Sequence, residues 1–194
     1  MKTHRILLTG LASALLLAGC ASIAPAPAGP YAIGKSHVSL QKTWSVVTPL
    51  MLGLPKEGQV LSINGPYLDR LYILDGLPEG GSLIKAVKKE NPTPVFRKGL
   101  TATEQIEFVS DSVAALGYER VVTSRPRPAK MDGKDALRFD LTLRTTGGLD
   151  LSGAALAAVV NDKLYLVLFL APSEHYYQTM LPDVEQIMSS FKIG

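Results

Sequence analysis

The sequence predicts an α+β domain, in which a twisted antiparallel sheet carries helices packed against it. Residues 136–144 alternate apolar and polar side chains, which is typical of a strand with one buried face. Residues 101–116 and 173–191 instead repeat apolar side chains at helical spacing. Turn-forming pairs, Gly-Gly at 147–148 and Asn-Asp at 161–162, separate apolar segments. Strands are therefore expected to follow one another as a meander between two helices.

The chain begins with the features of an export signal. After a basic start, residues 6–17 are mostly apolar, and small residues lead to Cys20, the only cysteine. This order is typical of a cleaved secretory signal, and the run is shorter than the roughly 20 apolar residues of a spanning helix. Leu17-Ala-Gly-Cys20 resembles the lipobox of bacterial lipoproteins. The resemblance implies that Cys20 is acylated, with palmitate as the expected modification. An ordinary signal peptide cut elsewhere is the alternative.

The expected anchor also predicts where the protein works. Two or more acyl chains hold a protein firmly to a bilayer, because each buried methylene contributes about 0.8 kcal/mol. In the lipoprotein family an Asp after the cysteine tends to retain the protein in the inner membrane, whereas residue 21 here is Ala. The resemblance therefore implies an outer-membrane lipoprotein that faces the periplasm of the bacterial cell envelope. Residues 21–30 are rich in Ala and Pro, which predicts a semi-rigid spacer. The predicted division is a signal peptide over 1–19, the lipidated cysteine and tether over 20–35, and one domain over 36–194.

The charge balance argues against nucleic acid as a partner. The formal net charge of the chain is +3. Without Lys2 and Arg5 of the signal, 18 basic residues stand against 17 acidic ones, which leaves +1. Such a balance gives no electrostatic footprint for a polyanion. Acylation of Cys20 would leave no free thiol, which excludes disulfides, thiol catalysis and cysteine metal sites.

Three short strands and a helix are expected in the first half of the domain. The strands cover 43–47, 59–63 and 68–74, with an Asn-Gly-Pro turn after the second and a loop after the third, over 77–93. Trp44 lies within the first strand and is expected in the core. The helix over 101–116 opens with Thr-x-x-Glu, the capping-box pattern, and ends at a glycine.

The second half continues with four strands and a final helix. The strands are expected over 119–125, 136–144, 149–160 and 164–170. The last of them is apolar on both faces, which places it in the centre of the sheet, covered on both sides. The final helix over 173–191 has Ser173 as its expected cap, and Pro182 should kink or split it.

The C-terminal segment resembles a known fold. Residues 161–173 read as a Leu-Tyr strand with apolar followers and an Ala-Pro turn, and Tyr177 and a closing Ser190-Phe191 come after it. This pattern is similar to small proteins of the Mog1/PsbP-like fold, which include bacterial lipoproteins of uncharacterised function. The resemblance implies that fold over most of residues 40–194. It also implies an accessory or binding role, since members include photosystem extrinsic subunits, a small-GTPase partner and assembly factors. It transfers no site residue.

No catalytic or metal motif is present in the mature sequence. Its histidines are His37 and His175, too few for a metal site without cysteines. Ser152 lies inside a predicted strand rather than on the turn that carries a hydrolase nucleophile. Residues 132–135 suggest a cation loop but lack its repeated oxygen ligands, so a plain turn is favoured. We therefore expect no enzyme, no metal and no cofactor.

Two basic clusters are candidate contact surfaces. One precedes the first helix and contains Lys85, Lys88, Lys89, Arg97 and Lys98. The other contains Arg125, Arg127 and Lys130, which intervening prolines keep stiff and extended. Either would suit anionic headgroups or an acidic partner, and the alternative is a set of solvated loop charges. The second cluster is the predicted contact surface.

These observations predict a membrane-anchored, non-enzymatic domain that binds an envelope protein or complex. The alternative is a carrier of a small apolar ligand or lipid, held between sheet and helix, because residues 149–170 and the last helix are rich in apolar side chains. An enzyme is the third possibility and would depend on His175 and Ser152.

Overall fold

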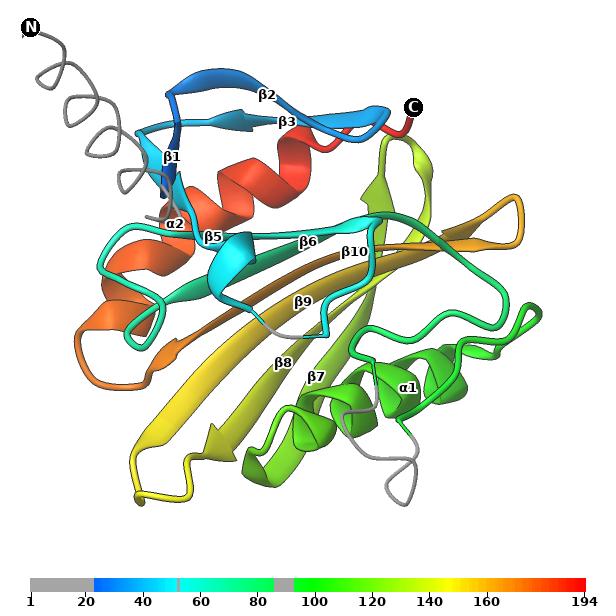
Figure 1. The fold of residues 1–194 in the computed structure, drawn as a ribbon. Helices are drawn as coiled ribbons and strands as arrows, with labels where there is room; N and C mark the ends of the chain where they lie inside the picture. Colours follow the sequence, from blue (N-terminus) through cyan, green and yellow to red (C-terminus); the bar gives the residue numbers. More distant parts are fainter. Residues whose placement is uncertain (1–22, 52, 86–92) are drawn as a thin grey trace, which may run out of the picture.

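The computed structural model describes residues 23–51, 53–85 and 93–194 (Figure 1). The predicted signal peptide and Cys20 lie outside these residues. Within them, no helix has both the length and the apolar character needed to cross a bilayer.

The described residues form an α+β fold around one large antiparallel sheet, which confirms the predicted class (Figure 1). Its eight strands lie in the order β1-β4-β5-β6-β10-β9-β8-β7. The strands are β1 (Ala24–Ala26), β4 (Trp44–Val46), β5 (Gly58–Ser62), β6 (Arg70–Pro78), β7 (Glu119–Met131), β8 (Lys134–Arg144), β9 (Asp150–Val160) and β10 (Lys163–Pro172). A short 3₁₀ turn, η1 (Thr48–Leu50), follows β4. The predicted meander is the half of the sheet from β7 to β10.

Strand β10 lies inside the sheet between β6 and β9, as its apolar sequence predicted. Leu164, Leu166 and Leu168 point to one face, while Val167 and Phe169 point to the other, and all are buried. Helix α1 (Ala102–Ala115) covers the first face, and helix α2 (Tyr176–Ser190) covers the second. The sheet therefore separates two hydrophobic cores.

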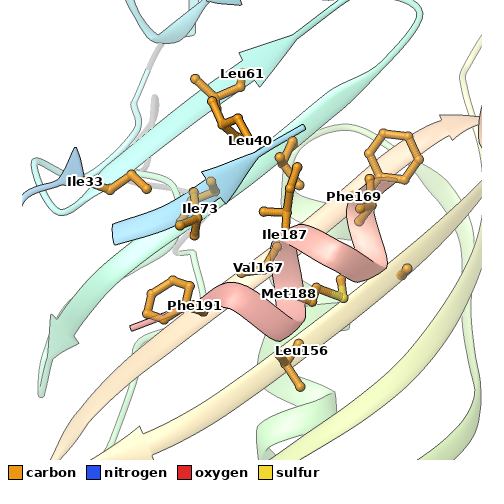
Figure 2. Packing of buried hydrophobic residues seen from close by; sticks show 14 of the residues in the cluster. Ile33, Leu40, Leu61, Ile73, Leu156, Val167, Phe169, Ile187, Met188 and Phe191 are labelled. Atoms are coloured by element: carbon orange, nitrogen blue, oxygen red, sulfur yellow. The ribbon is translucent and has the colours of Figure 1, made fainter. Parts of the chain in front are cut away.

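Helix α2 lies between the sheet and a separate hairpin of β2 (Gly29–Ile33) and β3 (Ser36–Leu40) (Figure 1). Figure 2 shows Ile187 of α2 between Leu40 of the hairpin and Val167 of the sheet, while Phe191 follows the end of the helix in the same cluster. The hairpin is fixed at its turn by Asp75, whose carboxylate accepts hydrogen bonds from the Lys35 amide at 2.7 Å and the Ser36 hydroxyl at 2.5 Å. Helix α2 is therefore covered by the sheet on one side and by the hairpin on the other.

The start of α1 follows its local sequence signal, whereas the start of α2 does not. Helix α1 has the predicted capping box, because Thr101 and Glu104 exchange hydrogen bonds between side chain and backbone. Helix α2 does not begin at Ser173 as predicted; the residue before it is His175, with φ 65°. Pro182 does not split the helix, which runs through it. Because proline has no N–H, the carbonyl of Gln178 loses its helical hydrogen bond. Pro182 and Gln178 are both exposed, so water can satisfy that carbonyl.

The predicted tether over 20–35 is largely part of the fold. Residues 24–26 form β1 and pair with β4, where Ala24 lies opposite Val46. Residues 29–33 form β2 of the hairpin. Proline is tolerated at a sheet edge, where one side of the strand needs no hydrogen bonds, so a Pro/Ala-rich segment can still pair there. The first strand of the described residues begins at Ala24.

Strand β7 is longer than predicted, since it continues through Pro126 and Pro128 to Met131. It is the last strand of the sheet, where a missing amide donor is tolerated. Its register with β8 shifts twice, between 119 and 122 and between 124 and 127. Arg120 and Arg125 lie at these bulges with φ of 52° and 50°. The bulges and prolines protect this edge from pairing with another chain.

Candidate functional site

The predicted contact surface on β7 is engaged in ion pairs within the molecule. Arg125 Nε lies 2.7 Å from Asp140 Oδ2, and Arg127 Nη1 lies 3.6 Å from the same oxygen. Lys130 Nζ lies 2.5 Å from Asp135 Oδ1. The structure thus brings Arg125 and Arg127 together on one carboxylate and leaves Lys130 with a separate partner. A ligand at this surface would compete with these internal carboxylates.

Asp140 belongs to a buried charged network beneath that surface. Arg138 and Asp140 are only 4% and 6% exposed, and Arg138 Nη1 donates to Asp140 Oδ1 at 2.8 Å. Arg138 Nη2 donates to Glu185 Oε1 of α2 at 2.6 Å. Burial, with Asp140 nearby, raises the pKa of Tyr177, whose hydroxyl donates to the Gly153 carbonyl. These contacts join β8, β9 and α2, so we assign the network a structural role.

The residues considered for catalysis are placed without a shared site. Ser152 Oγ lies 2.9 Å from Ser173 Oγ, and the His175 ring packs edge-on against Tyr176 at 5.2 Å between centroids. His37 is exposed on β3, where its backbone pairs with Lys192. In the described part of the chain, no group of three or more His, Cys, Asp or Glu side chains is placed to hold a metal ion.

The loop that suggested a cation site is occupied by the C-terminal segment. Asp132 accepts hydrogen bonds from Lys192 Nζ at 3.0 Å and from the Ile193 amide at 3.3 Å. These contacts with Lys192 and Ile193 lower the pKa of the Asp132 carboxyl. The β7–β8 turn therefore makes a structural contact with the C-terminal segment.

A small apolar cavity lies between α1 and the sheet rather than beside α2. Its lining includes Tyr72, Leu166 and Val113. Its volume is about 20 Å³, which is room for about one water molecule. Burial raises the pKa of Tyr72 to about 12, and its hydroxyl has no hydrogen-bond partner among the described residues. The cavity is too small for an acyl chain.

A cation surrounded by tyrosines lies at the end of the sheet where β6 begins. Arg70 Nη1 donates to the Tyr118 hydroxyl at 2.7 Å, and Nε donates to the carbonyl of Pro66. The Arg70 Cζ atom lies 5.9 Å from the ring centroids of both Tyr67 and Tyr118. This distance is within the range of cation–π attraction. We call Tyr67, Arg70 and Tyr118 the Arg70 cluster.

Sequence reasoning missed the Arg70 cluster. The available signal was the Asn-Gly-Pro turn at 64–66, which marks a loop but not what it presents. Tyr118 follows α1, 48 residues after Arg70, and the fold alone brings the two together. The Arg70 cluster lies at the start of β6, whereas the buried network of Arg138 and Asp140 lies on β8. The cluster is taken as the candidate site because no carboxylate pairs with Arg70 among the described residues.

Comparisons with known proteins establish the fold. No protein-family model matches the chain, and no match was found among curated proteins. A solved structure does match: the solution structure of cyanobacterial PsbP (CyanoP) from Synechocystis sp. PCC 6803. It is 16% identical, with a TM-score of 0.55, and the match covers 92% of this chain and 99% of that one. At this identity the likeness shows the fold alone, and the chain therefore has a PsbP-like fold.

Proposed function

We propose that this protein is a lipid-anchored accessory domain of the bacterial cell envelope, which binds an envelope protein or complex and performs no catalysis. The single observation that carries the proposal is the PsbP-like fold over 92% of the chain. That fold is consistent with an accessory protein. The lipobox-like residues before Cys20 supply the proposed anchor, and Ala21 supports the outer membrane, facing the periplasm.

The fold gives the proposed anchor a geometric consequence. Only residues 21–23 separate Cys20 from β1. Four residue steps span at most ~14 Å in an extended chain. An acylated Cys20 would therefore hold the β1 edge close to the membrane surface. Ile23 is 51% exposed and Leu50 of η1 is 44% exposed, and the β1–β4 register places both near this edge.

Such a short connection favours partners that are themselves in or on the membrane. A domain held within a short reach of the bilayer meets membrane proteins at a raised effective concentration. A carrier that shuttles an apolar ligand away from the membrane would need a longer tether, and the apolar cavity between α1 and the sheet is too small for an acyl chain. The accessory role is therefore preferred to the carrier role.

The test is a comparison of the intact protein with Cys20→Ser in growing cells. Metabolic labelling with an alkyne palmitate should mark the intact protein, which should fractionate with outer membranes. Cys20→Ser should be unlabelled and released into the soluble fraction. Chemical crosslinking before lysis should capture one envelope complex with the intact protein and less of it with Cys20→Ser. Unchanged labelling and fractionation of Cys20→Ser would refute the anchor.

A further inference from the structure

The loop between β5 and β6, residues 63–69, is held in one shape by hydrogen bonds to Asp69. This carboxylate is 1% exposed and accepts from the Ser62 hydroxyl at 2.6 Å. It also accepts from the backbone amides of Asn64 at 2.9 Å and Ile63 at 3.1 Å. Arg70 fixes the same loop from its other end through the Pro66 carbonyl. A loop already held in this way loses little conformational entropy when it binds a partner.

Tyr67 is presented at the surface by this rigid loop. It is 85% exposed, the highest value among the exposed large hydrophobic side chains of the described residues. Tyrosine and arginine are among the residue types enriched at binding hot spots. The Tyr67 ring also lies against the Arg70 guanidinium, so the two side chains form one continuous surface.

Arg70 lacks the carboxylate partner that Arg138 and Arg144 have. Arg138 is buried and Arg144 is partly exposed, and each forms an ion pair with a carboxylate, at 2.8 Å to Asp140 and 2.7 Å to Asp150. Arg70 has tyrosine rings, a hydroxyl and a carbonyl around it, and no carboxylate pairs with it among the described residues. Arg70 is only partly buried, so a partner carboxylate can still reach its guanidinium.

We propose that Tyr67 and Arg70 form the docking surface for an acidic segment of a partner protein. A partner Asp or Glu accepts hydrogen bonds from the Arg70 guanidinium, and an apolar side chain of the same segment packs on Tyr67. Charge-assisted hydrogen bonds of this kind are about twice as strong as neutral ones. This inference rests on the proposed function and specifies the partner's chemistry.

The state of Arg125 and Lys130 favours Arg70 over the contact surface predicted on β7. A carboxylate at Arg125 or Lys130 would displace an internal partner, Asp140 or Asp135. A carboxylate at Arg70 displaces only water, and flanking tyrosines have already removed part of the hydration of the guanidinium. Binding at Arg70 therefore gains an ion pair without breaking one.

The test uses the full anchored chain in cells with the photocrosslinker benzoylphenylalanine at position 67. The same probe at Leu149 and Val122, which are also exposed, serves as the positional control. We expect a single protein adduct at 67 whose mapped peptide contains Asp or Glu. Arg70→Glu should lower its yield at least tenfold, Arg70→Lys should retain part of it, and the exposed Arg97→Glu should leave it unchanged. Changing the mapped acidic residue to Lys should restore the adduct in Arg70→Glu.

Each other outcome overturns the inference. These outcomes are an adduct with phospholipid, a mapped peptide without acidic residues, or a yield that does not respond to Arg70→Glu. Thermal unfolding of the Arg70→Glu and Arg70→Lys variants establishes that loss of the adduct is not loss of the fold. Adducts at Leu149 or Val122 with none at 67 would refute this surface and leave the proposed function standing. No adduct at any position, together with Cys20→Ser behaving as the intact protein, would refute both.

Discussion

Arg138 and Asp140 form a buried ion pair between alternate residues of β8, with Nη1 and Oδ1 at 2.8 Å. Both side chains point to the α2 face, because residues two apart on a strand share a face. The strand has its expected alternation, but at these positions the polar face is covered rather than solvated. Arg138 also pairs with Glu185, and Asp140 also pairs with Arg125. Each buried side chain therefore has a second partner that is partly exposed.

We predict that Asp140→Ala lowers the free energy of unfolding by about 3 kcal/mol, because it removes the only buried carboxylate that pairs with Arg138 among the described residues and leaves the partly exposed Glu185 as its partner. Arg138→Met combined with Asp140→Leu should recover most of that loss, since neither charge is then buried. Urea unfolding followed by tryptophan fluorescence measures both. A double variant as unstable as the single one would contradict the structural role. Asp111→Ala, at an exposed site on α1, is the control and should change little.

Gly153 is required by close packing in β9. A Cβ atom there would lie 2.7 Å from Leu170 Cδ2 and 3.2 Å from Leu141 Cβ. We predict that Gly153→Ala destabilises the domain by ~1–3 kcal/mol through overpacking. Gly147→Ala is the matched control, because the nearest atom to its added Cβ would be Thr145 Oγ1 at 3.8 Å. Thermal unfolding of the two variants should separate them, and equal melting temperatures would show that the core accommodates the methyl group.

Asp69 holds the loop that carries Tyr67, so its removal should affect both stability and docking. Asp69→Ala leaves the Ser62 hydroxyl and the amides of Ile63 and Asn64 without their acceptor. We predict a loss of about 3 kcal/mol, because unsatisfied buried donors keep their full desolvation cost. Amide hydrogen exchange over residues 63–69 should become faster in this variant before the rest of the sheet is affected. Exchange that stays slow in the loop would show that its shape does not depend on Asp69.

The parts of the fold that could be predicted from sequence are those with local signals. The capping box of α1 depends on residues three apart, and the central position of β10 follows from its unbroken apolar run. Strands β1 and β2 were missed because alanine and proline carry no alternation, and their pairing depends on a distant strand and on the hairpin turn. The start of α2 was misplaced because a serine two residues earlier gave the local cap signal, whereas His175 lies in the left-handed region.

The candidate site was beyond sequence reasoning for the same reason. The Arg-Pro-Arg segment at 125–127 gave a local charge signal, but its internal partner Asp140 lies on the next strand. Arg70 is a single cation whose importance comes from Tyr118 and from the lack of an ion pair among the described residues. The fold decides which basic residues have an internal carboxylate partner. The order of charges along the sequence does not show this pairing.

The contact between Asp132 and the C-terminal segment should respond to pH in a defined direction. Hydrogen bonds from Lys192 and from the Ile193 amide lower the pKa of Asp132 below its ordinary 3.8. A carboxyl whose pKa is lower in the folded state contributes its stabilisation above 3.8, and this is lost as pH falls through the lower folded value. Acid should therefore release residues 192–194 from the β7–β8 turn.

NMR titration of the carboxyl carbons measures this directly. The Asp132 midpoint should lie below 3.8, and the Ile193 amide resonance should shift with the same midpoint. Asp132→Asn removes the titrating group, so the acid-dependent shift of Ile193 should disappear while α2 keeps its protection from hydrogen exchange. A midpoint at or above 3.8, or an Ile193 resonance that moves independently of Asp132, would mean that the carboxylate does not hold the C-terminal segment in solution.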